Sequence, residues 1–266
     1  MSVLIAPGVT DLHLPRIGWR AIDGTITASS EQEGFEADLA AKPQTYNAWK
    51  PDGIPRQWNI DAGEPVTVDY CGVGAHNLDE GGFSCRVFAS SDGVNFDPIT
   101  PTLQVSGPEA ILFLFPPESF RYWRLGIFDG AGQPRIGNIR FGEVMKLPRK
   151  SVFSPSLPIS EADQYTYNVN MSVTGEWLGR SVVSSGLEFR LTVENVSELF
   201  AAGEWADFRK HCNEGSAAFY VAPKPQAYPS EVAYAWPLEA VRAERAIPNS
   251  AISRRVELQC GGYSKK

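Results

Sequence analysis

The amino-acid sequence predicts a mainly β protein, and three observations support that prediction. Short segments rich in Val, Ile, Phe, Tyr and Trp alternate with polar residues, as strands with one buried face do. Turn formers separate these segments throughout the 266-residue chain, which contains 24 glycines and 20 prolines. Hydrophobic residues make up 43% of the chain and charged residues 21%, which is enough to form a substantial core. This pattern is typical of sandwiches and barrels rather than of helical or βαβ proteins.

The first half contains a series of segments with strand character, spaced as antiparallel strands are. Trp58 alternates with Gln57 and Asn59, so its ring is predicted to point into a core. Glycine-containing turns are expected at 61–63, 91–93 and 129–130. The candidate strands lie at 57–60, 66–73, 84–90, 110–115, 122–128 and 135–143.

The second half begins with a segment, 146–158, that combines three prolines with a basic cluster and is predicted to be a linker. Alternating segments then return at 165–173, 180–183 and 187–193, and again at 217–222, 232–236 and 254–259. Between these two groups, Trp205, Phe208 and Cys212 share one face of a predicted helix. We therefore expect an N-terminal arm at 1–16, a β domain at 17–145, the linker, and a second, barrel-type β domain with one short helix at 159–266.

Charge and hydropathy exclude several partners. The 24 Lys and Arg against 31 Asp and Glu give a net charge of −7, so the chain lacks the basic surface that nucleic acid requires. The apolar run at 111–115 is too short to cross a membrane and ends at Pro116, so no membrane insertion is expected. The first residues lack the pattern of a secretory leader, which predicts a chain made in the cytoplasm.

The usual catalytic motifs are missing from the sequence. There is no Gly-x-Ser-x-Gly elbow, no phosphate-binding Gly-rich loop ending in Gly-Lys-Ser/Thr and no His-Glu-x-x-His helix. His13, His76 and His211 each have a structural interpretation. The 31 acidic residues leave open a carboxylate pair for glycoside cleavage, but nothing selects one. We predict no catalytic site, and hence no enzyme.

The four cysteines are widely and irregularly spaced, without the Cys-x-x-Cys pairs of chelating loops. Buried free thiols are the expected state. A metal site would require Cys212 and Cys260 to meet His211, so whether these two cysteines take part in one is left open. We predict no metal and no cofactor.

An ordered set of short phrases runs through the first half. They are TASS at 27–30, RQWNI at 56–60, CGVGAHNL at 71–78, FASSDG at 88–93, RYWRL at 121–125 and IGNIRFG at 136–142. In order and spacing they resemble the discoidin, or coagulation-factor type C, family, whose fold is a galactose-binding-like jelly roll. The resemblance covers about residues 17–145 and implies a jelly-roll sandwich there.

The discoidin resemblance also implies a ligand site, because the family binds through loops at one end of the sandwich. The corresponding loops here are 44–49 and 76–82, and they offer Tyr46, Trp49, His76 and Asn77 as candidate glycan-binding residues. Tyr46 and Trp49 would stack on a sugar ring, although exposed loop aromatics serve protein interfaces equally well. The domain ends lack the cysteine pair of secreted members, which fits cytoplasmic synthesis.

The second half is similar to the barrel-type domain of bacteriophage tail-tip proteins in the phrases WLGRS at 177–181, FYVAPKP at 219–225 and YPSEVAYAW at 228–236. The resemblance implies a structural virion protein, a distal tail subunit that forms a homo-oligomeric ring. Its partners would be the tail tube, hub or fibre. The jelly roll would be displayed for attachment to a host-surface glycan.

Four aromatic residues of the second half, Tyr220, Tyr228, Tyr234 and Trp236, alternate with prolines that restrict sheet pairing, and we expect them to form an intermolecular interface. The alternative is that they complete their own domain's core. The alternative function for the whole chain is a carbohydrate-binding module that recognises cell-surface glycan, and a glycoside hydrolase ranks below both. Ring order, host and receptor do not follow from the sequence.

Overall fold

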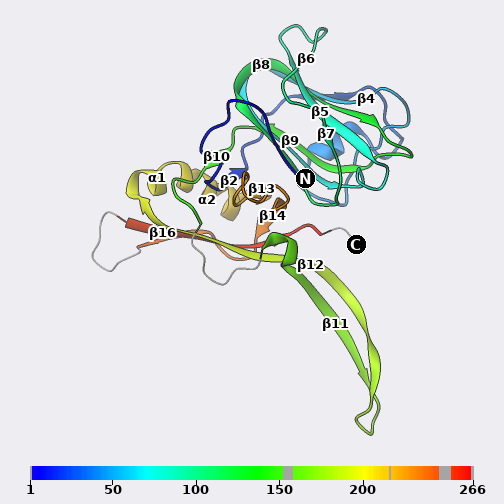
Figure 1. The fold of residues 1–266 in the computed structure, drawn as a ribbon, viewed down its shortest axis with the longest axis vertical. Coiled ribbons are helices and arrows are strands. Elements are labelled where there is room, and N and C mark those ends of the chain that lie inside the picture. Colours follow the sequence, from blue (N-terminus) through cyan, green and yellow to red (C-terminus); the bar gives the residue numbers. More distant parts are fainter. Residues whose placement is uncertain (1, 152–157, 216, 246–252, 265–266) are drawn as a thin grey trace.

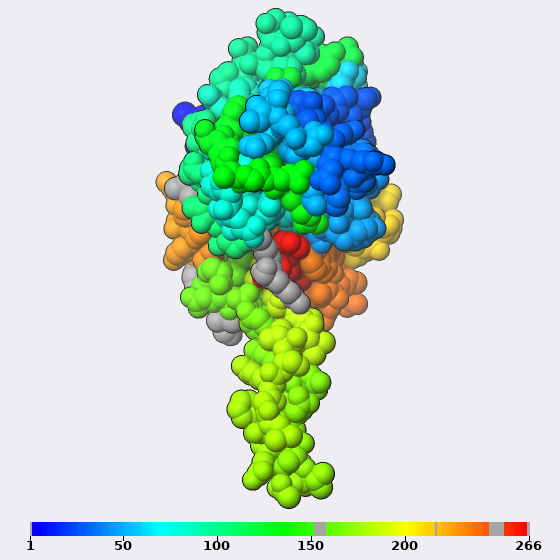
Figure 2. All heavy atoms as spheres, turned by 90° about the vertical axis from the view of Figure 1, so that its right-hand side faces the viewer, coloured from blue at the N-terminus to red at the C-terminus, as the bar shows by residue number. Residues whose placement is uncertain are grey.

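The computed structural model describes residues 2–151, 158–215, 217–245 and 253–264. Most described residues lie in strands, which form two eight-stranded sheets, so the predicted mainly β class is confirmed. One sheet builds a compact sandwich, and the other lies beneath it with two short helices on one face (Figure 1). From the second sheet a two-stranded arm projects away from the body (Figures 1 and 2).

The sandwich is organised around two long strands that each contribute to both of its layers. Strand β4 (Arg56–His76) pairs with β8 (Ile111–Asp129) over three stretches, separated by two register shifts between Asp61 and Tyr70. Trp58 and Trp123 are buried between the layers, as the alternation around Trp58 predicts. The other strands of this sheet are β1 (Val3–Ile5), β3 (Thr25–Ala28), β5 (Phe83–Ser90), β6 (Asp97–Pro98), β7 (Leu103–Gln104) and β9 (Ile136–Gly142), and η1 (Ala37–Ala41) is a short 3-10 helix beside β9.

The second sheet packs one face on the helical segment. The expected helix forms as α1 (Glu198–Ala202) followed at once by α2 (Glu204–Glu214), and Trp205, Phe208 and Cys212 of α2 are buried on the sheet as predicted. In the described residues this sheet is open, with β10 at one edge and β11 at the other. Its strands run in the order β10 (Met145–Lys146), β2 (Arg16–Gly18), β13 (Phe219–Ala222), β14 (Ala233–Pro237), β16 (Ser253–Gly262), β12 (Trp177–Ser197) and β11 (Asp163–Met171), with β15 (Arg242–Arg245) also on β16.

The chain passes between the two sheets more than once. The N-terminal segment predicted at 1–16 contains β1, which pairs with β8 of the sandwich. The same segment reaches β2 of the second sheet at Arg16. After the sandwich the chain returns to the second sheet through β10, where Met145 pairs with Ile17. The predicted linker therefore starts inside a strand, and its residues 152–157 lie outside the described residues. The division into domains stays a prediction. The strand pairing shows that β2 and β10, which belong to the second sheet, lie on either side of residues 19–144 in the chain.

A tight contact joins the two sheets, and two of the predicted interface residues form it. Tyr220 and Tyr234 are 0% and 1% exposed, with ring centroids 4.9 Å apart. The Tyr220 hydroxyl donates to Asn138 Oδ1 at 2.7 Å, and the Tyr234 hydroxyl donates to the Pro43 carbonyl at 2.7 Å. The expectation that these two rings contact another molecule is therefore wrong, because they complete this chain's own core. Tyr228 and Trp236 remain partly exposed.

Candidate functional site

The loop end of the sandwich contains the four residues predicted to bind glycan, but only one of them is free to do so. Tyr46 is 78% exposed. Trp49 is fully buried, pairs with Ile136 through the backbone and donates its indole N–H to the Ser30 carbonyl at 3.0 Å. The predicted stacking pair of Tyr46 and Trp49 is therefore not formed.

The other two residues of that prediction hold loops together. His76 is 2% exposed, and its Nε2 lies 2.9 Å from the Glu109 carbonyl oxygen. The Asn77 side chain donates to the Gln133 carbonyl and accepts from the Arg135 N–H at 2.6 Å. His76 and Asn77 thus have structural roles, because buried or loop-bridging polar groups must be hydrogen-bonded.

A cleft of about 290 Å³ opens at the same end of the sandwich, between the segments 51–56 and 132–133. Arg56 donates to the Asp129 and Gly132 carbonyls, which fixes its guanidinium at the cleft wall. Asp52 and Gln133 add a carboxylate and an amide, and no aromatic residue lines the cleft. Groups of this kind can hydrogen-bond the hydroxyls of a saccharide.

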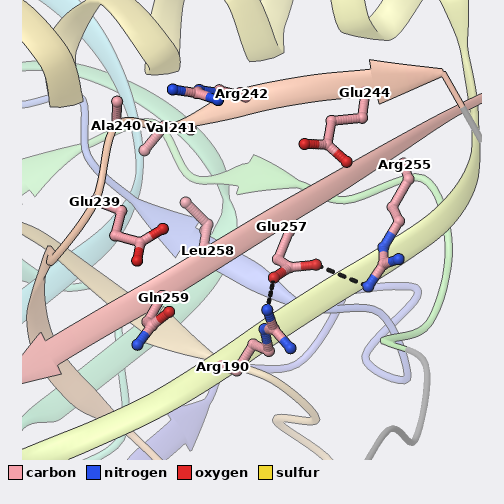
Figure 3. A pocket seen from close by; sticks show the side chains of 10 residues that line it. All are labelled: Arg190, Glu239, Ala240, Val241, Arg242, Glu244, Arg255, Glu257, Leu258 and Gln259. Carbon is pink, nitrogen blue, oxygen red and sulfur yellow. Dashed lines mark hydrogen bonds and ion pairs between the residues drawn. The ribbon is translucent and has the colours of Figure 1, made fainter.

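A second cleft, of about 380 Å³, lies on the second sheet and is lined by charges of both signs (Figure 3). Glu257 stands at its centre and forms ion pairs with Arg190 and, at 2.8 Å, with Arg255 (Figure 3). The remaining charged lining residues are Glu239, Arg242 and Glu244. Because three carboxylates balance three guanidinium groups, the lining has no net charge that would favour a ligand of one sign.

The cysteines give no sign of metal chemistry. All four are free and buried, and burial raises the pKa of the Cys212 thiol to about 12 and that of the Cys260 thiol well above its usual range. His211 Nε2 lies 3.1 Å from the Ala218 carbonyl oxygen. Within the described residues, no three His, Cys, Asp or Glu side chains are grouped as metal ligands. In the same part of the chain no helix has the length and apolar character needed to span a membrane.

The arm is the most unusual feature of the molecule, and it consists of β11 and the first part of β12. On β11 apolar residues alternate strictly with polar ones, so all of the apolar side chains share one face. Strand register adds residues of β12 to each face, since directly paired residues lie on the same side. The apolar face comprises Tyr165, Tyr167, Val169, Met171, Trp177 and Val182, and the polar face Gln164, Thr166, Asn168, Asn170, Ser181 and Ser184.

The apolar face of the arm is open to solvent. Its six apolar side chains are between 37% and 68% exposed. Tyr165 and Tyr167 stack with ring centroids 5.9 Å apart, and the Arg180 guanidinium lies 3.9 Å from the centre of the Tyr167 ring. Contiguous exposed apolar surface of this kind marks an interaction site.

The edges of the arm are open as well. β11 ends the strand order of its sheet, and β12 pairs with β16 only from Leu187 onward. The whole segment 163–187 has three charged residues, Asp163 at the root, Glu176 at the turn and Arg180. Proteins usually protect exposed edge strands with charges, prolines or covering segments, and this part of the chain has no proline and few charges.

The sequence contains a signal for this face beyond the strands that it predicts at 165–173 and 180–183. Alternation at 165–171 with tyrosines, valine and methionine on one side predicts a strand with one covered face. It does not reveal that the covering layer is missing from the chain itself.

Comparisons with known proteins identify the chain only loosely. No family model matches it and no curated protein matches it. A pectin-binding carbohydrate-binding module has 17% identity and a TM-score of 0.41 over 47% of this chain and 93% of that chain. The CBM32 of AlyQ, in complex with 4,5-unsaturated mannuronic acid, has 16% and 0.40 over 46% and 98%.

A third module is CpGH89CBM32-5 from Clostridium perfringens, in complex with GalNAc-β-1,3-galactose, with 14% identity and a TM-score of 0.42 over 47% of this chain and 100% of that chain. All three are small β modules that match less than half of this chain. Identities and TM-scores this low say nothing about what the chain binds.

Proposed function

We propose that this chain is a non-catalytic structural subunit that joins other copies of itself through the β11–β12 arm and displays the sandwich on the assembly. The observation that carries the proposal is the open apolar face of the arm. A two-stranded hairpin is at best marginally stable in water, and the six apolar side chains of this one remain 37–68% exposed. Such an arm is stabilised when a partner covers it.

The free energy of burying the apolar face of the arm supports association. Fully burying one large apolar side chain contributes about 1.5–3 kcal/mol. Covering the exposed half of six such side chains therefore contributes roughly 4–9 kcal/mol. Association costs on the order of 4–15 kcal/mol in lost freedom of motion, so the apolar face is a major part of an interface that also includes polar contacts.

The finer assignment we propose is the tail tip of a bacteriophage, with the chain as a distal tail subunit in a homo-oligomeric ring. Its neighbours would be the tail tube, hub or fibre, and its location the tail of the virion. The support for this assignment is the sequence resemblance at 177–181, 219–225 and 228–236. The solved structures described above are carbohydrate-binding modules and add nothing to it.

The test is the mass of the purified protein by light scattering, for the wild type and for two arm variants. Tyr167→Lys places a charge on the apolar face, whereas Asn168→Lys places the same charge on the opposite face of the same strand. We expect the wild type and Asn168→Lys to form the same oligomer and Tyr167→Lys to be a folded monomer with the circular dichroism spectrum of the wild type. A wild type that is monomeric at every concentration would contradict the proposal.

A second candidate function is glycan recognition by the displayed sandwich, which the cleft beside Arg56 favours. Its carboxylate, guanidinium and amide are polar groups fixed at the loop end of the sandwich. The test is a glycan array with the wild type, Asp52→Ala and Tyr46→Ala. Binding that is lost in Asp52→Ala supports the cleft, and binding lost only in Tyr46→Ala assigns recognition to the exposed ring. No bound glycan with the wild type would rule this function out for the glycans on the array.

A further inference from the structure

We propose that the arm of one copy docks, head to tail, into a hollow at the root of the next copy's arm. This inference rests on the proposed function, because it names the surface that the arm binds. It assigns two sites to each chain, a donor site on the projecting part of the arm, from Tyr167 outward, and an acceptor site where the root of the arm meets the body.

The acceptor hollow has a volume of about 260 Å³ and lies where three parts of the chain meet. The sandwich contributes the loop that contains Glu109, the start of the arm contributes Asp163 and Tyr165, and the C-terminal segment contributes Tyr263. Ile159 of the short helix η2 (Ile159–Glu161), Leu187 of β12 and Val232 line it with apolar surface. Among the residues that the structure describes, no lysine or arginine lines this hollow.

The two sites are complementary in chemistry. The hollow combines apolar walls with the carboxylates of Glu109 and Asp163. The apolar face of the arm has a single charge, that of Arg180, which the Tyr167 ring holds on this face at 3.9 Å. An apolar surface with one positive charge thus matches an apolar surface with negative charges, and complementarity of this kind selects both partner and orientation.

The donor site on the arm cannot reach the acceptor hollow of its own chain. Each residue of β11 from Asp163 to Met171 pairs with β12, with register shifts after Thr166 and after Asn170, and the hairpin points away from the body (Figures 1 and 2). Arg180 is paired with Val169, six residues along β11 from Asp163, which corresponds to ~20 Å of extended strand. The contact between the two sites must therefore form between copies. Because donor and acceptor differ, repeated contacts generate a closed ring or an open filament.

A lipid surface is the other class of occupant for an apolar ribbon. Arg180 disfavours it, because a guanidinium in the middle of a lipid-facing surface is strongly unfavourable. A protein hollow with two carboxylates instead offers that charge its partners. The observations therefore favour a second copy of this chain.

The test uses one donor-site variant and one acceptor-site variant. Arg180→Glu reverses the charge on the arm and leaves the hollow intact. Glu109→Lys combined with Ser230→Lys reverses and fills the hollow with changes that lie off the arm. We expect each variant alone to self-associate at least about tenfold more weakly than the wild type, a loss of about 1.4 kcal/mol. Melting temperatures near that of the wild type would show that both variants fold.

Mixing the two variants gives the decisive result. The intact arm of the hollow variant should dock into the intact hollow of the Arg180→Glu variant, so a 1:1 mixture should recover an association that neither variant shows alone. If the hollow variant still forms the wild-type oligomer while Tyr167→Lys does not, the arm binds elsewhere, as in arm-to-arm pairing, and the head-to-tail inference falls while the proposed function stands. A wild type that stays monomeric but sediments with phosphatidylcholine vesicles would overturn both.

Discussion

The contact between the two sheets predicts a strong and specific sensitivity at Gly72. A Cβ atom at this position would lie 2.5 Å from two carbons of the Tyr220 ring. That ring cannot retreat, because it is fully buried and its hydroxyl donates to Asn138 Oδ1 at 2.7 Å. Overpacking of this kind costs about 1–3 kcal/mol. We therefore expect Gly72→Ala to destabilise the protein by about 2 kcal/mol.

A double-mutant cycle isolates the clash from other effects of the substitution. Tyr220→Ala removes the ring and should itself cost about 3–5 kcal/mol, as large aromatic deletions in cores do. In that background Gly72→Ala meets empty space and lowers the entropy of the unfolded chain, which stabilises by about 0.4–1 kcal/mol. The same substitution should thus change sign, from destabilising with Tyr220 present to neutral or stabilising without it.

The assay is urea denaturation of the four proteins with linear extrapolation to water. Gly53→Ala is the control, because a Cβ atom there meets no atom closer than 4.0 Å and should change stability little. Gly63→Ala is unsuitable, because Gly63 has a φ of +80°, which an alanine adopts only with strain. If Gly72→Ala lowered the free energy of unfolding equally with and without Tyr220, Tyr220 would not pack tightly on β4. The proposed contact between the two sheets would then be wrong.

Three further predictions test the body of the molecule. Burial raises the pKa of Asp69 to about 6 from the ordinary 3.8, so between pH 4 and 6 the folded state holds a proton that the unfolded chain has lost. Stability should therefore fall as the pH rises through that window. Asp69→Asn should raise the melting temperature at pH 8 and flatten the dependence of stability on pH. A dependence on pH that is unchanged in Asp69→Asn would show that this carboxyl does not cause the fall. Because all four thiols are buried, Ellman's reagent should label the native protein far more slowly than the urea-unfolded protein, and equally rapid labelling would contradict that burial. Tryptic cleavage at the exposed Lys150 should leave two fragments that co-elute on a sizing column, since β2 and β10 tie both fragments to one sheet, whereas fragments that separate without denaturant would mean that the two parts fold independently.

Local pattern predicts much of this fold, for reasons visible at single residues. Trp58 lies in an alternating strand and is buried as expected, with its indole N–H donating to the Ala37 carbonyl. Trp205, Phe208 and Cys212 follow helical spacing and share the buried face of α2. In these cases the periodicity that a strand or helix imposes on its neighbours decides which face is covered.

Long-range contacts explain where sequence interpretation fails. The sequence places Trp49 in a loop and predicts that it binds a ligand, but its backbone bridge to Ile136 holds it in the core. Tyr220 lies among prolines and suggests an external interface, yet Gly72 and Gly74 leave room for its ring on a strand far away in the chain. Neither Ile136 nor Gly72 is near in sequence, so no local pattern could reveal either contact.

The arm shows a third limit of sequence interpretation. Alternation at 165–171 is the same whether the covering layer belongs to this chain or to another. Only the fold reveals that Phe189 of β12 belongs to the same core as the buried face of α2 and that the arm extends beyond this core.

Amide hydrogen exchange across the arm, measured at increasing protein concentration, tests the central claim most directly. If the arm joins one copy to the next, the amides of 163–171 should become protected as the concentration rises, while amides in the sandwich core exchange at a constant rate. Exchange in 163–171 that stays fast and independent of concentration would contradict the claim.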